Sequence, residues 1–175
     1  MTTIDGTTEA DLARALIDEI LSRPVERRFD RDAERDVVNA LRVRALRQQL
    51  VDTGCYTVDE LARGRDSNPN AVHSWLRTAT KTHRLIKISI GNEIVVPAVL
   101  LDDAFDTNPA WQPVIAALAG IGLDPWAIWA WIATPTGWLD DQTPADLIDT
   151  HPDLVTAAAR ARAATSQQRS SQQNK

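Results

Sequence analysis

The side chains best suited to chemistry lie in one polar segment, TVDELARGRDSNPNAVHSWLR, at residues 57–77. Asparagine can pair bidentately with adenine and arginine with guanine, so amide and guanidinium groups on one helix surface suit the edges of DNA bases. If Val72 and Trp75 anchor the second half of the segment in a core, its outward face carries the candidate DNA-binding residues Asn68, Asn70, His73, Ser74 and Arg77. Lys81, Arg84 and Lys87 follow on the same side, within reach of phosphates.

The spacing within this segment predicts a helix-turn-helix. That motif needs a small residue in its first helix, here Ala62, and two apolar anchors in its second helix, here Val72 and Trp75. Asp66 stands at the turn position where glycine is usual, and aspartate tolerates left-handed backbone better than most residues. The alternative is a plain helical hairpin in a small core, with its polar residues merely solvated.

The distribution of charge supports contact with a polyanion. The chain of 175 residues has a net charge of −5, yet residues 1–87 hold 15 Lys and Arg against 14 Asp and Glu. Residues 88–175 hold 4 Lys and Arg against 10 Asp and Glu. Residues 63–87 contain six basic residues and one acidic residue, Asp66. A basic island in an acidic chain predicts one surface that meets a nucleic acid and another that meets something else.

Composition excludes several other classes of function. The chain is 43% hydrophobic and 25% charged, as in soluble globular proteins, and no apolar run approaches the ~20 residues that span a bilayer. The N-terminus has no signal-peptide pattern, so we expect a cytoplasmic protein. One cysteine, Cys55, and three scattered histidines argue against a disulfide or a metal site. The chain contains no phosphate-binding loop, nucleophile elbow or paired-carboxylate motif, so we expect no enzyme and no cofactor.

The elements that must position these residues are mostly helical. Apolar spacing predicts one helix from Thr8 to Pro24 and a second from about Asp30 to Asp52, ended by Gly54. KISI and EIVVP, joined by Gly91-Asn92, predict a short β-hairpin over 87–97. Helical patterns resume after Asn108. We therefore predict a mainly α fold, with a helix-turn-helix core, a short β-hairpin and a C-terminal helical module.

The expected domain organisation follows from these elements. Residues 1–56 form N-terminal helices with a candidate dimerisation role, and residues 57–98 hold the helix-turn-helix and hairpin. Residues 99–165 form a helical partner-binding module. Residues 166–175, SQQRSSQQNK, are polar and low in complexity, so we expect disorder there.

The C-terminal half is unusually rich in tryptophan. Five of the six tryptophans lie within 28 residues: Trp111, Trp126, Trp129, Trp131 and Trp138. Two interpretations stay open. The indoles either fill a compact core or leave an exposed aromatic patch, where tryptophan makes strong anchors for a protein partner.

The stretch from GNEIVVPAVL to TPADLI resembles the C-terminal part of Xre/MbcA/ParS-type antitoxins, the antitoxins of RES–Xre toxin–antitoxin pairs. In that family a hairpin ending in a Pro-apolar segment leads to a Trp-apolar pair and then to spaced prolines and leucines. The matching positions here are Val96, Pro97, Ala98, Trp131, Ile132, Pro135, Leu139, Pro144 and Leu147. With the helix-turn-helix positions Ala62, Val72 and Trp75, the resemblance covers about residues 57–165.

The resemblance implies an antitoxin that sequesters a cognate RES-type, NAD-degrading toxin and represses its own operon as a homodimer on operator DNA. The toxin-facing residues would be Trp138, Leu139, Asp140 and Asp141. Two features depart from the family: the N-terminal helices are longer than its members need, and the polar tail extends further. The alternative is a stand-alone helix-turn-helix repressor, such as a phage immunity repressor, whose C-terminal helices dimerise or touch DNA.

Overall fold

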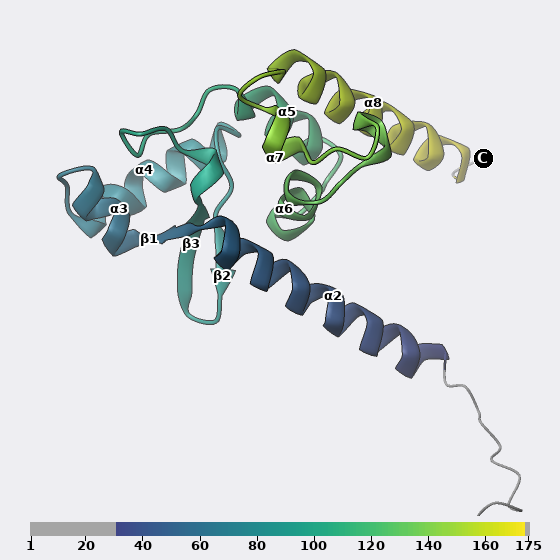
Figure 1. Ribbon diagram of the computed structural model, residues 1–175, viewed down its shortest axis with the longest axis horizontal. Coiled ribbons are helices and arrows are strands. Elements are labelled where there is room, and N and C mark those ends of the chain that lie inside the picture. The colour runs from purple at the N-terminus through teal and green to yellow at the C-terminus, as the bar shows by residue number, and fades with distance from the viewer. Residues whose placement is uncertain (1–30, 174–175) are drawn as a thin grey trace, which may run out of the picture. The chain divides into compact units, whose positions relative to one another are not determined.

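The structure, a computed structural model, describes residues 31–173, so the helix expected over 8–24 lies outside the described residues (Figure 1). The chain divides into two compact units, residues 1–42 and 43–175. The sequence places a boundary further on, at residue 56. The first described helix, α2 (Arg31–Thr53), begins in the first unit and ends in the second. Gly54 ends it at a φ of 92°, as predicted.

The second unit begins with a strand, two helices and a hairpin. They are β1 (Cys55–Thr57), α3 (Val58–Gly64), α4 (Pro69–Lys81), β2 (Ile88–Ile90) and β3 (Glu93–Pro97). The three strands form an antiparallel sheet in the order β1-β3-β2, with Tyr56 opposite Val96 and Ser89 opposite Ile94. The predicted hairpin is therefore confirmed, whereas β1 was not predicted. The strand before the two helices thus pairs with the hairpin that follows them.

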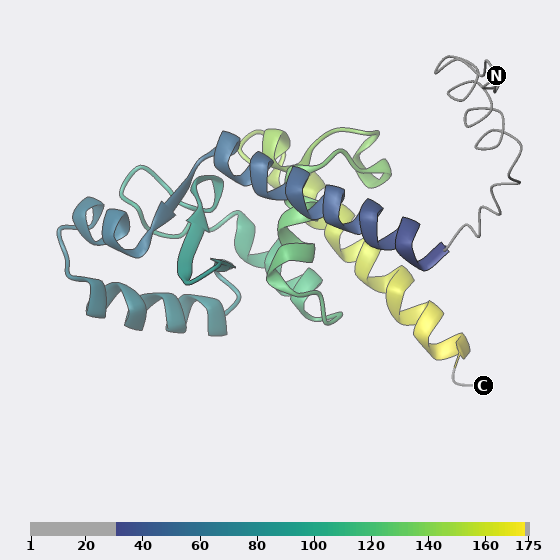
Figure 2. The ribbon, with the colours of Figure 1, turned by 90° about the horizontal axis from the view of Figure 1, so that it is seen from below.

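The remaining helices follow a single-turn 3-10 helix, η1 (Ala98–Leu100). They are α5 (Trp111–Ala119), α6 (Pro125–Ala133), the 3-10 turn η2 (Gly137–Leu139), α7 (Pro144–Leu147) and α8 (Pro152–Gln173). The Asp124 side chain caps α6 by accepting the Ala127 N–H at 2.8 Å, and Pro125 follows at the first position. Helices α5 and α8 lie side by side, and α3 and α4 lie at the opposite end of this unit from the C-terminus of α8 (Figures 1 and 2).

Helix α8 differs from the expectation of disorder over residues 166–173, because it remains helical to Gln173. These residues are polar and low in complexity, so the sequence predicts disorder there. The packing of Val155, Ala159 and Ala163 already forms the helix upstream, and each further residue then adds one hydrogen bond without a new nucleus. Glutamine and arginine are good helix formers, so the polar end continues the helix.

One hydrophobic core joins the helix-turn-helix to the C-terminal helices. It includes Leu61, Val72 and Leu76 from α3 and α4 together with Trp111 and Trp129 from α5 and α6. The compact-core interpretation of the tryptophans holds for Trp111, Trp129 and Trp131, which are at most 4% exposed. Trp126 is partly buried, whereas Trp138 is 44% exposed. The exposed-patch interpretation is thus reduced to Trp138. No helix within residues 31–173 is long and apolar enough to cross a bilayer.

Candidate nucleic-acid interface

Helix α3 is fixed at its start by a reciprocal cap. The Thr57 hydroxyl accepts the Glu60 N–H at 3.3 Å, and the Glu60 carboxylate accepts the Thr57 N–H at 2.7 Å. The backbone N–H of Thr57 is the main cause that holds the pKa of Glu60 below its usual value. This cap therefore adds stability above the ordinary pKa of glutamate, and the contribution is lost as the pH falls through the lowered pKa.

The turn between α3 and α4 is built on Asp66, which has a φ of 48°. The Ser67 N–H reaches back to the Ala62 carbonyl at 2.8 Å, and the Asp66 N–H bonds the Arg63 carbonyl at 3.2 Å. These two bonds form a Schellman motif, which places its left-handed residue where glycine is usual. Asp66 therefore adopts the left-handed backbone conformation that was expected at this turn.

Replacing Asp66 by glycine is expected to raise the free energy of unfolding by about 0.5–1 kcal/mol, because glycine adopts a positive φ without the Cβ strain. Urea unfolding measures the change. Asp103→Gly is the control, because Asp103 is exposed and has no positive φ, so glycine there should be neutral or destabilising. A loss of stability in Asp66→Gly would show that the carboxylate itself stabilises the turn.

Helix α4 is anchored through a slightly different set of residues than predicted. Val72 is buried as expected, but Trp75 is only partly buried, and Leu76 and Ala79 fill the remaining buried positions. The Arg65 guanidinium lies over the Trp75 ring, 4.0 Å from its centroid. Trp75 still packs against the core as predicted, and Leu76, which follows it directly, is a further anchor that the spacing did not identify.

The outward face of α4 carries the predicted polar residues. Asn70, His73, Ser74, Arg77 and Lys81 lie on α4 itself. Asn68 caps the start of the helix and Arg84 follows its end, and all seven residues are exposed. The Asn68 side-chain oxygen is used as the helix cap and accepts the Ala71 N–H at 3.0 Å, which leaves its amide nitrogen for other contacts. Within residues 31–173, the side chains of Asn70, His73, Ser74, Arg77 and Lys81 make no hydrogen bond or ion pair. They lie at helical spacing along one surface.

The basic island divides into two groups in the structure. Arg63, Arg77 and Lys81 are exposed, whereas Arg65 lies against the protein. Arg65 donates to the Phe105 carbonyl at 2.6 Å and lies 3.7 Å from the Asp106 carboxylate. Arg84 donates to the Thr107 hydroxyl at 3.0 Å. Arg65 and Arg84 thus tie the helix-turn-helix to the loop over 101–110, and no local pattern in the sequence indicates either contact.

Phe105 packs closely on the end of α3. Its ring lies 5.1 Å from the Tyr56 ring in an edge-to-face arrangement. A Cβ added to Gly64 would lie only 2.7 Å from the same ring. Glycine at position 64 therefore permits the loop over 101–110 to cover the helix-turn-helix.

Gly64→Ala is expected to lower the free energy of unfolding by about 1–2 kcal/mol, since the overlap with Phe105 outweighs the gain in helix propensity. Urea unfolding of the single variant, of Phe105→Ala and of the double variant isolates the clash. The Gly64→Ala penalty should vanish in the Phe105→Ala background. Gly137→Ala is the control, because a Cβ there meets nothing within 4 Å. An equal penalty in both backgrounds would contradict this explanation.

A shallow hollow of about 250 Å³ separates the start of α4 from the hairpin turn. His73 lines it from α4, and Asn92 lines it from the hairpin. The hairpin turn was predicted as structure only, so Asn92 is an addition to the candidate residues. Asp59 and Glu93 also line the hollow. Their charge disfavours a phosphate there, and the cationic side chains of Arg77 and Lys81 lie toward the other end of α4.

The predicted partner-binding residues lie on a tight turn after α6. Trp138, Asp140 and Asp141 are exposed, and the two aspartates have φ values of 51° and 60°. Leu139 is only 4% exposed and belongs to the core, so its assignment as a partner-facing residue is corrected. Its side chain packs in the hydrophobic core and so anchors the turn η2. Many positions of the antitoxin resemblance are buried in the same way, including Val96, Ile132 and Pro144.

The described residues offer neither an activated thiol nor a cluster of metal ligands. Burial, and then the charge of Glu60, raise the pKa of the Cys55 thiol, which keeps it protonated and a poor nucleophile. Among residues 31–173, no group of three or more His, Cys, Asp and Glu side chains comes together to hold a metal ion.

Comparison with known proteins adds a likeness in fold. No family model matches the chain, and no curated protein matches it. The solved NMR structure of a protein called Rv2175c resembles it with a TM-score of 0.53. The match has 21% sequence identity and covers 64% of this chain and 82% of the other. At that identity the likeness extends to the fold alone: a mainly α chain with a small antiparallel sheet.

Proposed function

We propose that this protein binds double-stranded DNA through the outward face of α4. The observation that carries the proposal is that this face presents amide, imidazole, hydroxyl and cationic groups without partners among the described residues, while its opposite side is buried. A helix of this kind fits the major groove, where Asn70, His73 and Ser74 would meet base edges. Arg77 would contact guanine or phosphate, and Lys81 would contact phosphate.

The narrower proposal is an antitoxin that represses its own operon as a homodimer. It depends on the resemblance to Xre/MbcA/ParS-type antitoxins, and the exposure of Trp138 beside two aspartates supports a protein-binding role for this turn. The alternative is a stand-alone repressor, such as a phage immunity repressor, which needs α4 but no toxin. A neighbouring gene for a RES-type toxin favours the antitoxin, and a phage lysogeny region favours the repressor.

The DNA-binding proposal is tested by titrating the full chain against the DNA upstream of its own gene at two salt concentrations. We expect tighter binding to this DNA than to a shuffled duplex of the same length, with affinity that falls steeply as salt rises. Equal affinity for both duplexes would contradict sequence-specific reading. A well-folded protein with no affinity for either duplex would remove the DNA-binding assignment.

The antitoxin proposal has a separate test. The chain is co-expressed with the toxin candidate from the neighbouring gene, and growth is measured. We expect rescue by the wild type and loss of rescue by Trp138→Ala. Val51→Ala, which removes another exposed apolar side chain, is the matched control and should rescue. No rescue by a folded wild-type chain would leave the stand-alone repressor as the better proposal.

A further inference from the structure

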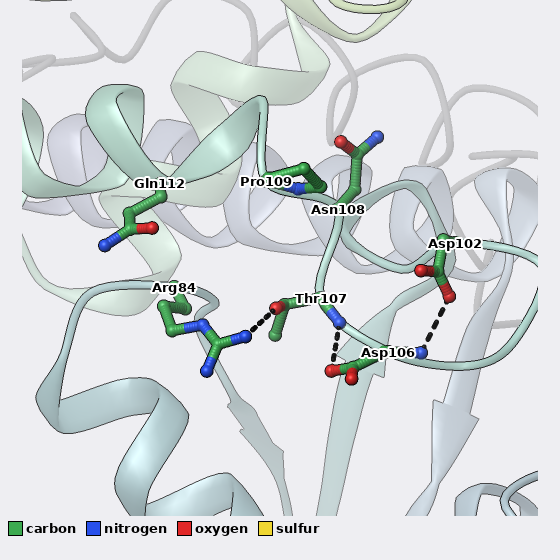
Figure 3. Close-up of a pocket in the computed structure, with 7 residues that line it drawn as sticks. All are labelled: Arg84, Asp102, Asp106, Thr107, Asn108, Pro109 and Gln112. Carbon is green, nitrogen blue, oxygen red and sulfur yellow. Dashed lines mark hydrogen bonds between the residues drawn. The ribbon is translucent and has the colours of Figure 1, made fainter.

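A small polar pocket lies where the end of α4 meets the C-terminal helices. Its accessible volume is about 250 Å³, and its walls come from the residue after the α4 turn, the loop over 101–110 and the first turn of α5. Figure 3 shows Arg84 and Gln112 on one side of the pocket, Asp102 on the opposite side and Thr107 between them. The volume is below the range of pockets that hold drug-sized ligands, so it suits a small metabolite.

One side of the pocket offers hydrogen-bond donors. Arg84 uses one nitrogen to donate to the Thr107 hydroxyl at 3.0 Å, and it forms no ion pair within residues 31–173. A guanidinium has five N–H donors, so most of them remain available. Thr107 is only 6% exposed, and its own hydroxyl proton has no acceptor among the described residues. The Gln112 amide makes no side-chain hydrogen bond there either. These three groups suit a carboxylate.

The other side of the pocket offers acceptors on a rigid loop. One oxygen of Asp102 accepts the N–H groups of Ala104 and Asp106, each at 2.9 Å, which fixes the carboxylate and leaves its second oxygen without a hydrogen bond in the described chain. Asp106 accepts the Thr107 N–H at 2.7 Å and lies near Arg65. The loop therefore presents negative charge in a fixed position, which suits an ammonium group.

We propose that this pocket binds a small zwitterion, an amino acid or a similar amine carboxylic acid. Its carboxylate is held by Arg84, Thr107 and Gln112, and its ammonium group faces Asp102. The two signs of charge decide the class of ligand. Asp102 and Asp106 repel an anion that carries no positive group, and Arg84 repels a cation that carries no negative group. A charge-assisted contact at each end fixes the orientation of the ligand.

The position of the pocket gives the ligand a consequence for α4. Arg84 directly follows His83, which has a φ of 54° in the turn after α4, and the Arg84 N–H donates to the Ala79 carbonyl at 2.8 Å. A carboxylate that occupies the Arg84 donors withholds them from a DNA phosphate. We therefore expect the bound zwitterion to weaken DNA binding, a consequence that rests on the proposed function, whereas ligand binding itself does not.

The test uses the isotope-labelled full chain and backbone amide NMR shifts, without DNA. The probes are the standard amino acids and a length series from glycine through β-alanine and γ-aminobutyrate to aminohexanoate. Acetate, inorganic phosphate and ethylammonium are the single-charge controls. We expect at least one zwitterion to saturate shifts at Arg84, Thr107 and Gln112 with a Kd of about 1 mM or below. The single-charge controls should bind at least about tenfold more weakly.

Variants separate a specific pocket from loss of folding. Gln112→Ala removes an exposed side chain without hydrogen bonds, and Arg84→Gln removes the cation. Each variant should lower the affinity for the zwitterion at least about tenfold, while the amide spectrum elsewhere stays that of the wild type. Asp103→Asn, on the same loop but outside the pocket, should bind as the wild type does. The proposal is overturned if no zwitterion shifts the pocket, if acetate or phosphate binds equally well, or if both pocket variants bind normally.

Separate measurements of zwitterion binding and of DNA affinity distinguish the failure of one proposal from the failure of the other. If a zwitterion binds and DNA affinity is unchanged by it, the pocket stands and its coupling to α4 is rejected. If the chain binds DNA and no zwitterion binds the pocket, the proposed function stands and the pocket assignment is rejected.

Discussion

Trp111→Ala is expected to lower the free energy of unfolding by about 3–5 kcal/mol. Trp111 is fully buried at the start of α5, and its indole N–H donates to the Val99 carbonyl at 2.8 Å. Truncation removes the largest type of side chain from the core and also leaves this carbonyl without its partner, which adds a desolvation cost. The loss is large because a cavity of this size does not collapse completely. Urea unfolding followed by circular dichroism measures it.

Trp138→Ala is the matched control for this experiment. It deletes the same side chain at a position that is 44% exposed and forms no indole hydrogen bond within the described residues. The stability of this variant should change by less than about 1 kcal/mol. Similar losses in the two variants would mean that the tryptophans do not differ in burial as described.

The double variant Arg77→Ala/Lys81→Ala is expected to bind operator DNA roughly 10- to 1000-fold more weakly than the wild type at moderate salt. The two residues are four apart on α4, so both side chains face the same way. If Arg77 and Lys81 both contact phosphate, the slope of log affinity against log salt should fall by about two. If Arg77 contacts guanine instead, the slope should fall by about one and the lost base contact should cost ~1–3 kcal/mol. Titrations at several salt concentrations measure both quantities.

Arg160→Ala/Arg169→Ala removes the same net charge from exposed positions on α8 and serves as the control. It should leave the salt slope nearly unchanged, because these side chains lie on another helix. If both double variants weaken binding equally, the effect comes from the overall charge of the protein, and α4 has no special role. If neither changes the affinity, the assignment of α4 as the recognition helix is wrong.

Much of the fold follows from local signals in the sequence. Asp124-Pro125 correctly marks the start of α6, Gly54 the end of α2, and Gly91-Asn92 the hairpin turn, because each of these residues acts on the backbone beside it. Strand β1 has no such signal. Its three residues become a strand only by pairing with β3, so that Cys55 lies opposite Pro97. Because the partner strand lies about 40 residues further along the chain, the three residues of β1 carry no local pattern that predicts the pairing.

The candidate site divides in the same way. The exposed face of α4 was predicted because helical periodicity alone separates Arg77 from Val72. The structural contacts of Arg65 and Arg84 were not, since their partners, Phe105 and Thr107, lie on a distant loop. Nothing in the local sequence distinguishes an arginine that holds a loop from one that remains exposed. The pocket beside Arg84 has the same origin, because its walls come together only in the folded chain.

The core that the helix-turn-helix shares with the C-terminal helices has a consequence for resistance to proteolysis. Elements that share one core unfold together, so a partner that binds only the native C-terminal helices also lowers the unfolded fraction of α4. The abundance of such a partner would then set how long the chain survives proteolysis, without any movement of α4. A separately expressed 57–98 fragment lacks more than half of the buried residues of that core and forfeits this protection.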